Sequence, residues 1–145
     1  MSTLSNSEIL GTVISLMTEK ANQVAFEELK KYEKAHENAY IDQEIRDIVQ
    51  QRAASDLLLK TCSFKPSPEI DLDTLKGEFE NWFLLEEEQN LRQSIVSTIT
   101  LELKKRYKPG EENLTFTERF LKKVKEQGKQ MNTVGLMDSL KDQKP

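Results

Sequence analysis

The fold is decided by residues 5–32, which read SNSEILGTVISLMTEKANQVAFEELKKY. Apolar side chains recur in this stretch at steps of three and four residues, the spacing that places them on one face of an α-helix. The stretch opens with Ser5-Asn6-Ser7-Glu8, in which Ser5 and Glu8 have the spacing of a capping box. We therefore predict a first helix over residues 6–36, with an apolar stripe that extends from Ile9 to Tyr32.

The length of this stripe also bears on self-association. It offers more apolar surface than one antiparallel neighbour is expected to cover, and large exposed apolar patches mark interaction sites. We therefore expect a homodimer that forms through this helix and that Met17→Glu would weaken.

A second helix is expected after a break in the chain at residues 37–42. The next group of apolar residues would lie roughly 110 to 120° away from the first stripe if the first helix simply continued. Asn38 and Asp42 both have side chains that can cap a new helix, and we predict that this helix ends near Lys60.

A crossing loop is predicted over residues 62–70. Pro66 and Pro68 each lack a backbone N–H, and each pushes the residue before it toward an extended conformation. A third helix is expected to start after this loop, with Asp71 or Asp73 as its cap.

The apolar face changes part of the way along the third segment. One group of apolar residues shares a face, and a second group lies on nearly the opposite face of the same helical wheel. The first group is Leu72, Leu75, Phe79, Trp82 and Phe83, and the second is Leu91, Ile95 and Ile99. Asn90 and Gln93 resemble a capping pair, so we predict a bend or break at residues 86–90 with a fourth helix beyond it. The aromatic residues of the first group are expected in the core.

A fifth helix is predicted after Lys108-Pro109-Gly110, a sequence that ends the fourth. Thr115 and Glu118 have the spacing of a second capping box. Gly128 is the predicted end of this helix, because glycine is favoured just after a helix terminus. Residues 131–145 are predicted to form a short helix or tail.

Composition supports an all-α fold. The chain has 145 residues, a length typical of a single domain. It contains five glycines and four prolines, which is about half the average share of these residues. An all-β domain would need turn residues at about every 8 to 12 positions. We therefore predict a bundle of five or six helices, with residues 1–130 as a single helical domain.

The sequence contains few residues suited to metal or nucleophilic chemistry. His36 and Cys62 are its only histidine and cysteine, too few for a clustered zinc site or an intramolecular disulfide. Glu33 and His36 match the spacing of a di-iron ligand pair, but such sites need that motif twice. The segment that begins at Asp71 fails the calcium-loop pattern, because Lys76 occupies the glycine position. Phosphate loops and nucleophile motifs are also missing, so we expect no enzymatic activity, metal or cofactor.

Charge is distributed unevenly along the chain, whose net charge is −4. Residues 65–90 include two basic and eight acidic residues, whereas residues 103–130 include nine basic and four acidic residues. The basic segment contains an amphipathic helix with the apolar residues Phe116, Phe120, Leu121 and Val124. The candidate partner-binding residues are the cations Lys104, Lys105, Arg106, Arg119, Lys122, Lys123 and Lys125.

Three interpretations of the basic helix are open. An apolar side packed on the core, with a solvated basic back, is what surface helices ordinarily show. Alternatively, the cations bind an acidic protein surface, or residues 104–129 bind nucleic-acid phosphates. If the Pro109-Gly110 turn folds the fifth helix back beside the fourth, the seven candidate cations form one surface.

We therefore expect a non-enzymatic protein–protein interaction module, such as an adaptor, assembly factor or regulatory subunit. Its predicted partner is a protein with an acidic surface, and the alternative function is that of a small nucleic-acid-associated regulator. The sequence shows no secretory signal and no membrane-spanning segment, which predicts a cytoplasmic protein without membrane contacts.

Overall fold

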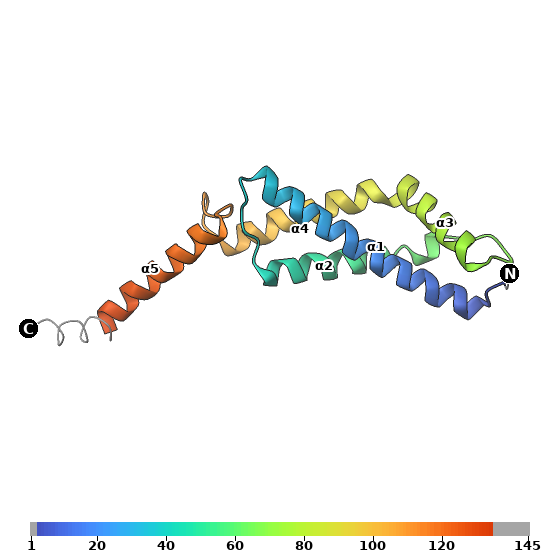
Figure 1. Ribbon diagram of the computed structural model, residues 1–145, viewed down its shortest axis with the longest axis horizontal. Coiled ribbons are helices and arrows are strands. Elements are labelled where there is room, and N and C mark those ends of the chain that lie inside the picture. Colours follow the sequence, from blue (N-terminus) through green and yellow to red (C-terminus); the bar gives the residue numbers. More distant parts are fainter. Residues whose placement is uncertain (1–2, 135–145) are drawn as a thin grey trace, which may run out of the picture.

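The computed structural model describes residues 3–134, with side chains as far as Gly128, and the regular elements in this part of the chain are all helical. In chain order they are α1 (Asn6–Ala35), α2 (Gln43–Leu58), a short 3₁₀ turn η1 (Thr61–Ser63), α3 (Leu72–Trp82), a π-helical turn η2 (Phe83–Glu87), α4 (Glu88–Arg106) and α5 (Phe116–Val134). Helices α1 to α4 pack into a bundle, and α5 extends away from it (Figure 1). The predicted all-α helical bundle is confirmed, but four helices of the described chain pack into it and not the predicted five or six, because α5 extends away from the bundle.

The core of the bundle is built from every fourth residue of its helices. The buried residues at this step are Ile45, Val49, Ala53 and Leu57 in α2, and Leu91, Ile95, Ile99 and Leu103 in α4. In α1 they are Val13, Met17, Ala21, Ala25 and Leu29. A four-residue step follows a ridge inclined to the helix axis by about 26°. Helices that interlock through this ridge cross one another, as α1 crosses α2 and α4 in Figure 1.

The turn between α1 and α2 occupies the predicted break at residues 37–42. Glu37 and Asn38 have positive φ values of 57° and 62°, the left-handed conformation that often ends a helix. Asp42 takes the position before the first residue of α2, although its side chain makes no capping hydrogen bond.

Three other predicted helix starts, at Ser5, Asp71 and Thr115, are confirmed by their hydrogen bonds. The Ser5 hydroxyl accepts a bond from Glu8 N at 3.2 Å, and the Glu8 carboxylate accepts one from Ser5 N at 2.9 Å. Asp71 caps α3 by accepting a backbone N–H bond at 2.8 Å. Thr115 and Glu118 form the second capping box, with bonds of 3.2 and 3.3 Å.

The predicted crossing loop is present between η1 and α3. Its residues Phe64 and Ile70 are buried in the core. The Phe64 ring centre lies 5.7 Å from that of Phe79 and 5.3 Å from that of Trp82. The aromatic residues of the third segment are therefore part of the core, as predicted, and the loop closes one end of the bundle over them.

The predicted bend near residues 86–90 lies at the π-helical turn η2, but the chain is not broken there (Figure 1). Asn90 lies inside α4, so the predicted cap at this residue is wrong. In a regular α-helix, Phe83 and Leu91 would point about 80° apart, because they are eight residues apart. A π turn accommodates one extra residue. It thereby brings both side chains into the same core.

Deletion of Glu86, an exposed residue of η2, tests this role of the π turn. Without the extra residue, α3 and α4 can join as a regular α-helix that keeps Phe83 and Leu91 on nearly the same face. We expect the free energy of unfolding in urea to change by less than about 1 kcal/mol. Insertion of an alanine at the same place should lower it by more than about 3 kcal/mol, because core side chains of α4 would turn to solvent. Equal losses would contradict this role.

The apolar stripe of α1 is largely covered within one chain. Val13, Met17 and Ala21 are buried in the core that α1 shares with α2 and α4. Leu10 and Ile14 remain exposed. The stripe therefore does not require a second copy to cover it, and Met17→Glu tests folding instead of assembly.

We expect Met17→Glu to lower the free energy of unfolding by more than about 3 kcal/mol, because it buries an unpaired carboxylate. Ile14→Glu places the same charge on an exposed position of the same helix and should change it by less than about 1 kcal/mol. Urea denaturation of both variants provides the measurement. Similar stability of the two variants would show that α1 does not pack as described.

Helix α5 continues to Val134, past the end predicted at Gly128. Gly110, before α5, is the only described glycine with a positive φ, at 89°. Gly128 therefore lacks the left-handed conformation that would end the helix, and the cost of about 1 kcal/mol for a glycine within a helix is tolerated. Residues 135–145, which belong to the predicted tail, lie outside the described residues.

Candidate interaction surface

Helix α5 is attached to the bundle through a small contact that we call the α5 joint, formed by residues 39–42 and 107–119. Ala39 and Thr115 form an isolated antiparallel bridge. Next to it, Tyr40 N donates a hydrogen bond to Leu114 O at 2.8 Å. The Tyr40 ring meets the Phe116 ring edge-on, with 5.0 Å between ring centres. The joint therefore fixes the first turn of α5 beside the start of α2.

Tyr32 ties the end of α1 to the same joint. Its hydroxyl donates a hydrogen bond to Asn113 Oδ1 at 2.6 Å. Burial and the nearby charge of Glu112 raise the pKa of Tyr32 above its ordinary value of 10.0. The hydroxyl therefore stays protonated at neutral pH and remains a donor.

Arg119 is the central side chain of the joint. Its Nη2 donates hydrogen bonds to Tyr40 O at 3.0 Å and to Glu112 O at 3.3 Å. Its guanidinium lies 3.8 Å from the centre of the Tyr107 ring, and its Nε lies 3.9 Å from Asp42 Oδ1. With only 12% of its side chain exposed, Arg119 is committed to contacts within the chain.

Two further cations near the joint are held by carboxylates. Lys122 pairs with Glu111, and its hydrogen bond lowers the pKa of that carboxyl below the ordinary value of 4.5. Arg106 Nη1 lies 3.1 Å from Glu44 Oε2 and so connects the end of α4 to α2. The Arg106–Glu44 pair bridges segments that are distant in the sequence, whereas the Lys122–Glu111 pair connects α5 to the loop directly before it.

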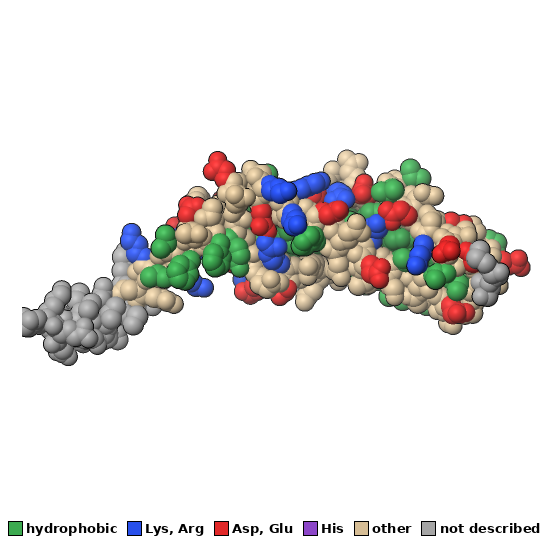
Figure 2. Space-filling view, in the orientation of Figure 1, with side chains coloured by type: hydrophobic (Ala, Val, Ile, Leu, Met, Phe, Trp, Pro, Cys, Tyr) green, Lys and Arg blue, Asp and Glu red, His purple; other side chains and the backbone are tan. Residues whose placement is uncertain are grey.

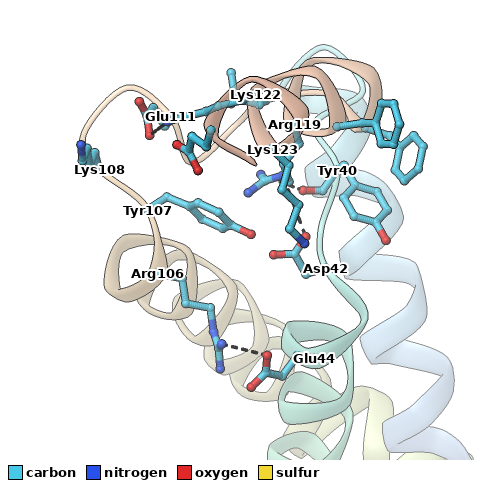
Figure 3. Close-up of a pocket in the computed structure, with 14 residues that line it drawn as sticks. Tyr40, Asp42, Glu44, Arg106, Tyr107, Lys108, Glu111, Arg119, Lys122 and Lys123 are labelled. Carbon is cyan, nitrogen blue, oxygen red and sulfur yellow. Dashed lines mark hydrogen bonds and ion pairs between the residues drawn. The ribbon is translucent and has the colours of Figure 1, made fainter. Parts of the chain in front are cut away.

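A pocket of about 630 Å³ opens between α5 and the end of the bundle (Figure 3). Part of its apolar wall comes from Tyr40, Phe116 and Phe120. Lys108 and Lys123 also line it, and neither has an ion pair among the described side chains. The acidic residues Asp42, Glu44, Glu111 and Glu126 line it as well. The pocket thus combines an apolar wall with charged groups of both signs.

The apolar face of α5 is not packed on the core. Phe116, Phe120, Leu121 and Val124 are between 48% and 59% exposed. Figure 2 shows hydrophobic side chains gathered over α5 where it leaves the bundle. The interpretation in which the apolar side packs on the core is therefore wrong, because the described side chains of α5 meet the bundle only at the joint. We call these four residues the α5 face.

The structure divides the seven cations that the sequence singled out. Those that line the pocket are Arg106, Arg119, Lys122 and Lys123. Those outside it are Lys104, Lys105 and Lys125. Helix α5 extends away from α4 and does not fold back beside it (Figure 1), so only four of the seven come together.

Sequence analysis missed the residues that build the joint around Arg119. Tyr40, Asp42 and Tyr107 come from segments whose positions relative to α5 depend on the tertiary fold. No motif connects these residues to Arg119, because Tyr40 and Asp42 belong to the turn between α1 and α2 and Tyr107 follows the end of α4. The turn signals at Asn38 and Pro109-Gly110 indicated only that two loops are present.

Within residues 3–134, no group of three or more His, Cys, Asp or Glu side chains is placed to hold a metal ion. In the same part of the chain, no helix combines the length and the apolar character needed to cross a bilayer. Cys62 is an exposed free thiol.

Comparison of the chain with protein-family models, with curated proteins and with solved structures finds no match. The function is therefore inferred from the contacts, exposure and charges of the chain itself. Of these, the α5 face and the pocket beside it are the features best suited to binding.

Arg119→Ala should loosen α5 without unfolding the bundle. It removes two hydrogen bonds from a charged donor, which contribute about 1.5–3 kcal/mol each. We expect hydrogen exchange of the Tyr40 amide to accelerate by about tenfold or more, while helix content measured by circular dichroism stays unchanged. Lys123→Ala, one turn further along α5, is the matched control and should leave the exchange rate unchanged. Exchange unaltered in Arg119→Ala would contradict the role assigned to Arg119.

Proposed function

We propose that this protein is a non-enzymatic protein–protein interaction module that binds an acidic protein surface through α5. The observation that carries the proposal is the exposed α5 face, which is fixed at the joint and extends away from the bundle. Large contiguous apolar patches on a protein surface mark interaction sites. A helix that presents such a face is typical of recognition in which a helix lies against a groove or a second helix.

Burial of the α5 face would supply most of the binding free energy. A fully buried valine, leucine or phenylalanine side chain contributes about 1.5–3 kcal/mol relative to an exposed one. Lys123 and Lys125 flank the apolar arc on its two sides, as the period of 3.6 residues per turn places them. Carboxylates on a partner would therefore be attracted to both edges of the face and would fix its orientation.

Nucleic-acid binding is the weaker alternative. Its affinity depends on how many cations are available to neutralise phosphates. Arg106 and Lys122 already hold Glu44 and Glu111, and Arg119 is used in the joint. Lys105 also pairs with Glu102, with 3.6 Å between Lys105 Nζ and Glu102 Oε1. Four of the seven candidate cations are thus engaged within the chain.

The proposal is tested by replacing Phe120 with a photo-reactive amino acid and cross-linking in cells of the source organism. We expect a cross-link to a protein, because Phe120 lies in the middle of the α5 face. The same amino acid at Leu59, which is exposed and far from α5 in the sequence, is the matched control and should give little product. Cross-links to RNA or DNA, or equal protein yields from both positions, would contradict the proposal.

Charge reversal tests the part of the proposal that concerns an acidic partner. Lys123→Glu with Lys125→Glu should lower the cross-linking yield at Phe120, while circular dichroism and the melting temperature stay nearly unchanged, because both residues are exposed. In cell extract, the loss should be largest at low salt and should shrink as screening increases. An unchanged yield would show that the partner surface is not acidic.

A further inference from the structure

We infer that a second copy of this chain is a partner of α5, and that the α5 face of one copy packs along the outer side of α3 and η2 of the next in a head-to-tail arrangement. This inference rests on the proposed function, because it names an occupant of the same face. It is carried by a second exposed apolar patch, of opposite charge, on the same molecule.

This second patch lies at the π turn, and we call it the acidic bend: Leu84, Leu85, Glu86 and Glu87. Leu84 is 50% exposed and Leu85 is 83% exposed, although both are large apolar side chains. The neighbouring acids Glu80 and Glu88 are paired with Lys20 and Arg92. Neither Glu86 nor Glu87 has an ion pair among the described side chains, so their charges are available to a partner.

The outer side of α3 extends the acidic bend into a surface long enough for a helix. Asp73 and Gly77 lie on one face of α3, because they are separated by four residues, and both are exposed. The exposed Leu84 follows in η2. Nothing lies within 4 Å of where a Cβ on Gly77 would be, so a second helix can approach closely there. Helix α3 and η2 contain 11 and 5 residues and are together about 24 Å long, and α5, with 19 residues, is about 28 Å long.

The two surfaces are complementary in chemistry. Each has large exposed apolar side chains in its centre, and they differ in the charges at their edges. Lys123 and Lys125 flank the α5 face, whereas Glu86 and Glu87 adjoin Leu84 and Leu85. Contact between them would bury apolar area and bring unpaired cations next to unpaired carboxylates.

Geometry requires that this contact form between two copies. Figure 1 shows α5 at one end of the molecule and the bend between α3 and α4 toward the other end, so α5 cannot reach the bend of its own chain. Two α5 helices packed face to face would place lysines against lysines, and two acidic bends would place glutamates against glutamates. The charges therefore favour a head-to-tail contact over a symmetric one, and repeated contacts of this kind build a chain of copies.

A contact of one helix against another is smaller than a standard protein–protein interface, so the association should be weak and dependent on concentration. The experiment measures the average mass of the full chain by sedimentation, from micromolar concentration to about 1 mM. A concentration of about 1 mM is high enough to detect an association with a free energy of about 4 kcal/mol. At low salt we expect the mass to rise above the monomer mass of 16.8 kDa. Salt near 1 M, which shortens the screening length to about 3 Å, should reduce this rise.

Two double variants separate the two surfaces. Phe120→Asp with Leu121→Asp removes the α5 face, and Leu84→Asp with Leu85→Asp removes the acidic bend. Each variant alone should remain a monomer. An equimolar mixture should form dimers and nothing larger, because each variant retains the surface that the other lacks.

The matched control is Leu10→Asp with Leu59→Asp, whose side chains are 53% and 82% exposed, nearly the same as the 50% and 83% of Leu84 and Leu85. This control should associate like the unaltered chain. A monomer at all concentrations, self-association that survives in either double variant, or a mixture that stays monomeric would each overturn the inference. The proposed function is tested separately, because a cross-link from Phe120 to a different protein would support it even if the chain were monomeric.

Discussion

The one extra residue in the π turn at Phe83–Glu87 is the constraint on which the bundle depends. The buried residues of α3 and α4 recur at steps of four on both sides of this turn. They reach the same core only because the turn absorbs the rotation that a regular helix would introduce between Phe83 and Leu91. The same turn leaves Leu84 and Leu85 exposed. The turn that brings Phe83 and Leu91 into one core therefore also forms the acidic bend.

The position of α5 depends on a different kind of contact. The bundle is closed by apolar packing, whereas α5 is held by a backbone bridge, by hydrogen bonds from Arg119 and by the ring contact between Tyr40 and Phe116. Because these contacts involve only the start of the helix, the α5 face beyond them stays uncovered. A polar joint thus leaves an apolar surface available, which apolar packing of the whole helix would have buried.

Charge along the sequence is only a partial guide to charge on the surface. The segment that includes α5 is basic, but Arg119, Lys122 and Arg106 are used within the chain. Part of the acidic segment is used in the same way, since Glu80 and Glu88 pair with Lys20 and Arg92. Among the charges left over, Lys123 and Lys125 lie next to the exposed apolar side chains of α5, and Glu86 and Glu87 lie next to Leu84 and Leu85. These two patches of opposite charge favour a head-to-tail contact.

The sequence by itself determined the helices and most of their starts, because capping and periodicity depend on residues three or four apart. Ser5 with Glu8, Asp71, and Thr115 with Glu118 are local signals of this kind, and each is confirmed by a hydrogen bond. Only the tertiary structure decided that α3 joins α4 through a π turn. A regular α-helix there would not bring both Phe83 and Leu91 into the one core in which they pack. Only the tertiary structure decided the direction of α5 as well. That direction is set by contacts such as that of Arg119 with Tyr40, which joins residues 79 positions apart and leaves no trace in local sequence pattern.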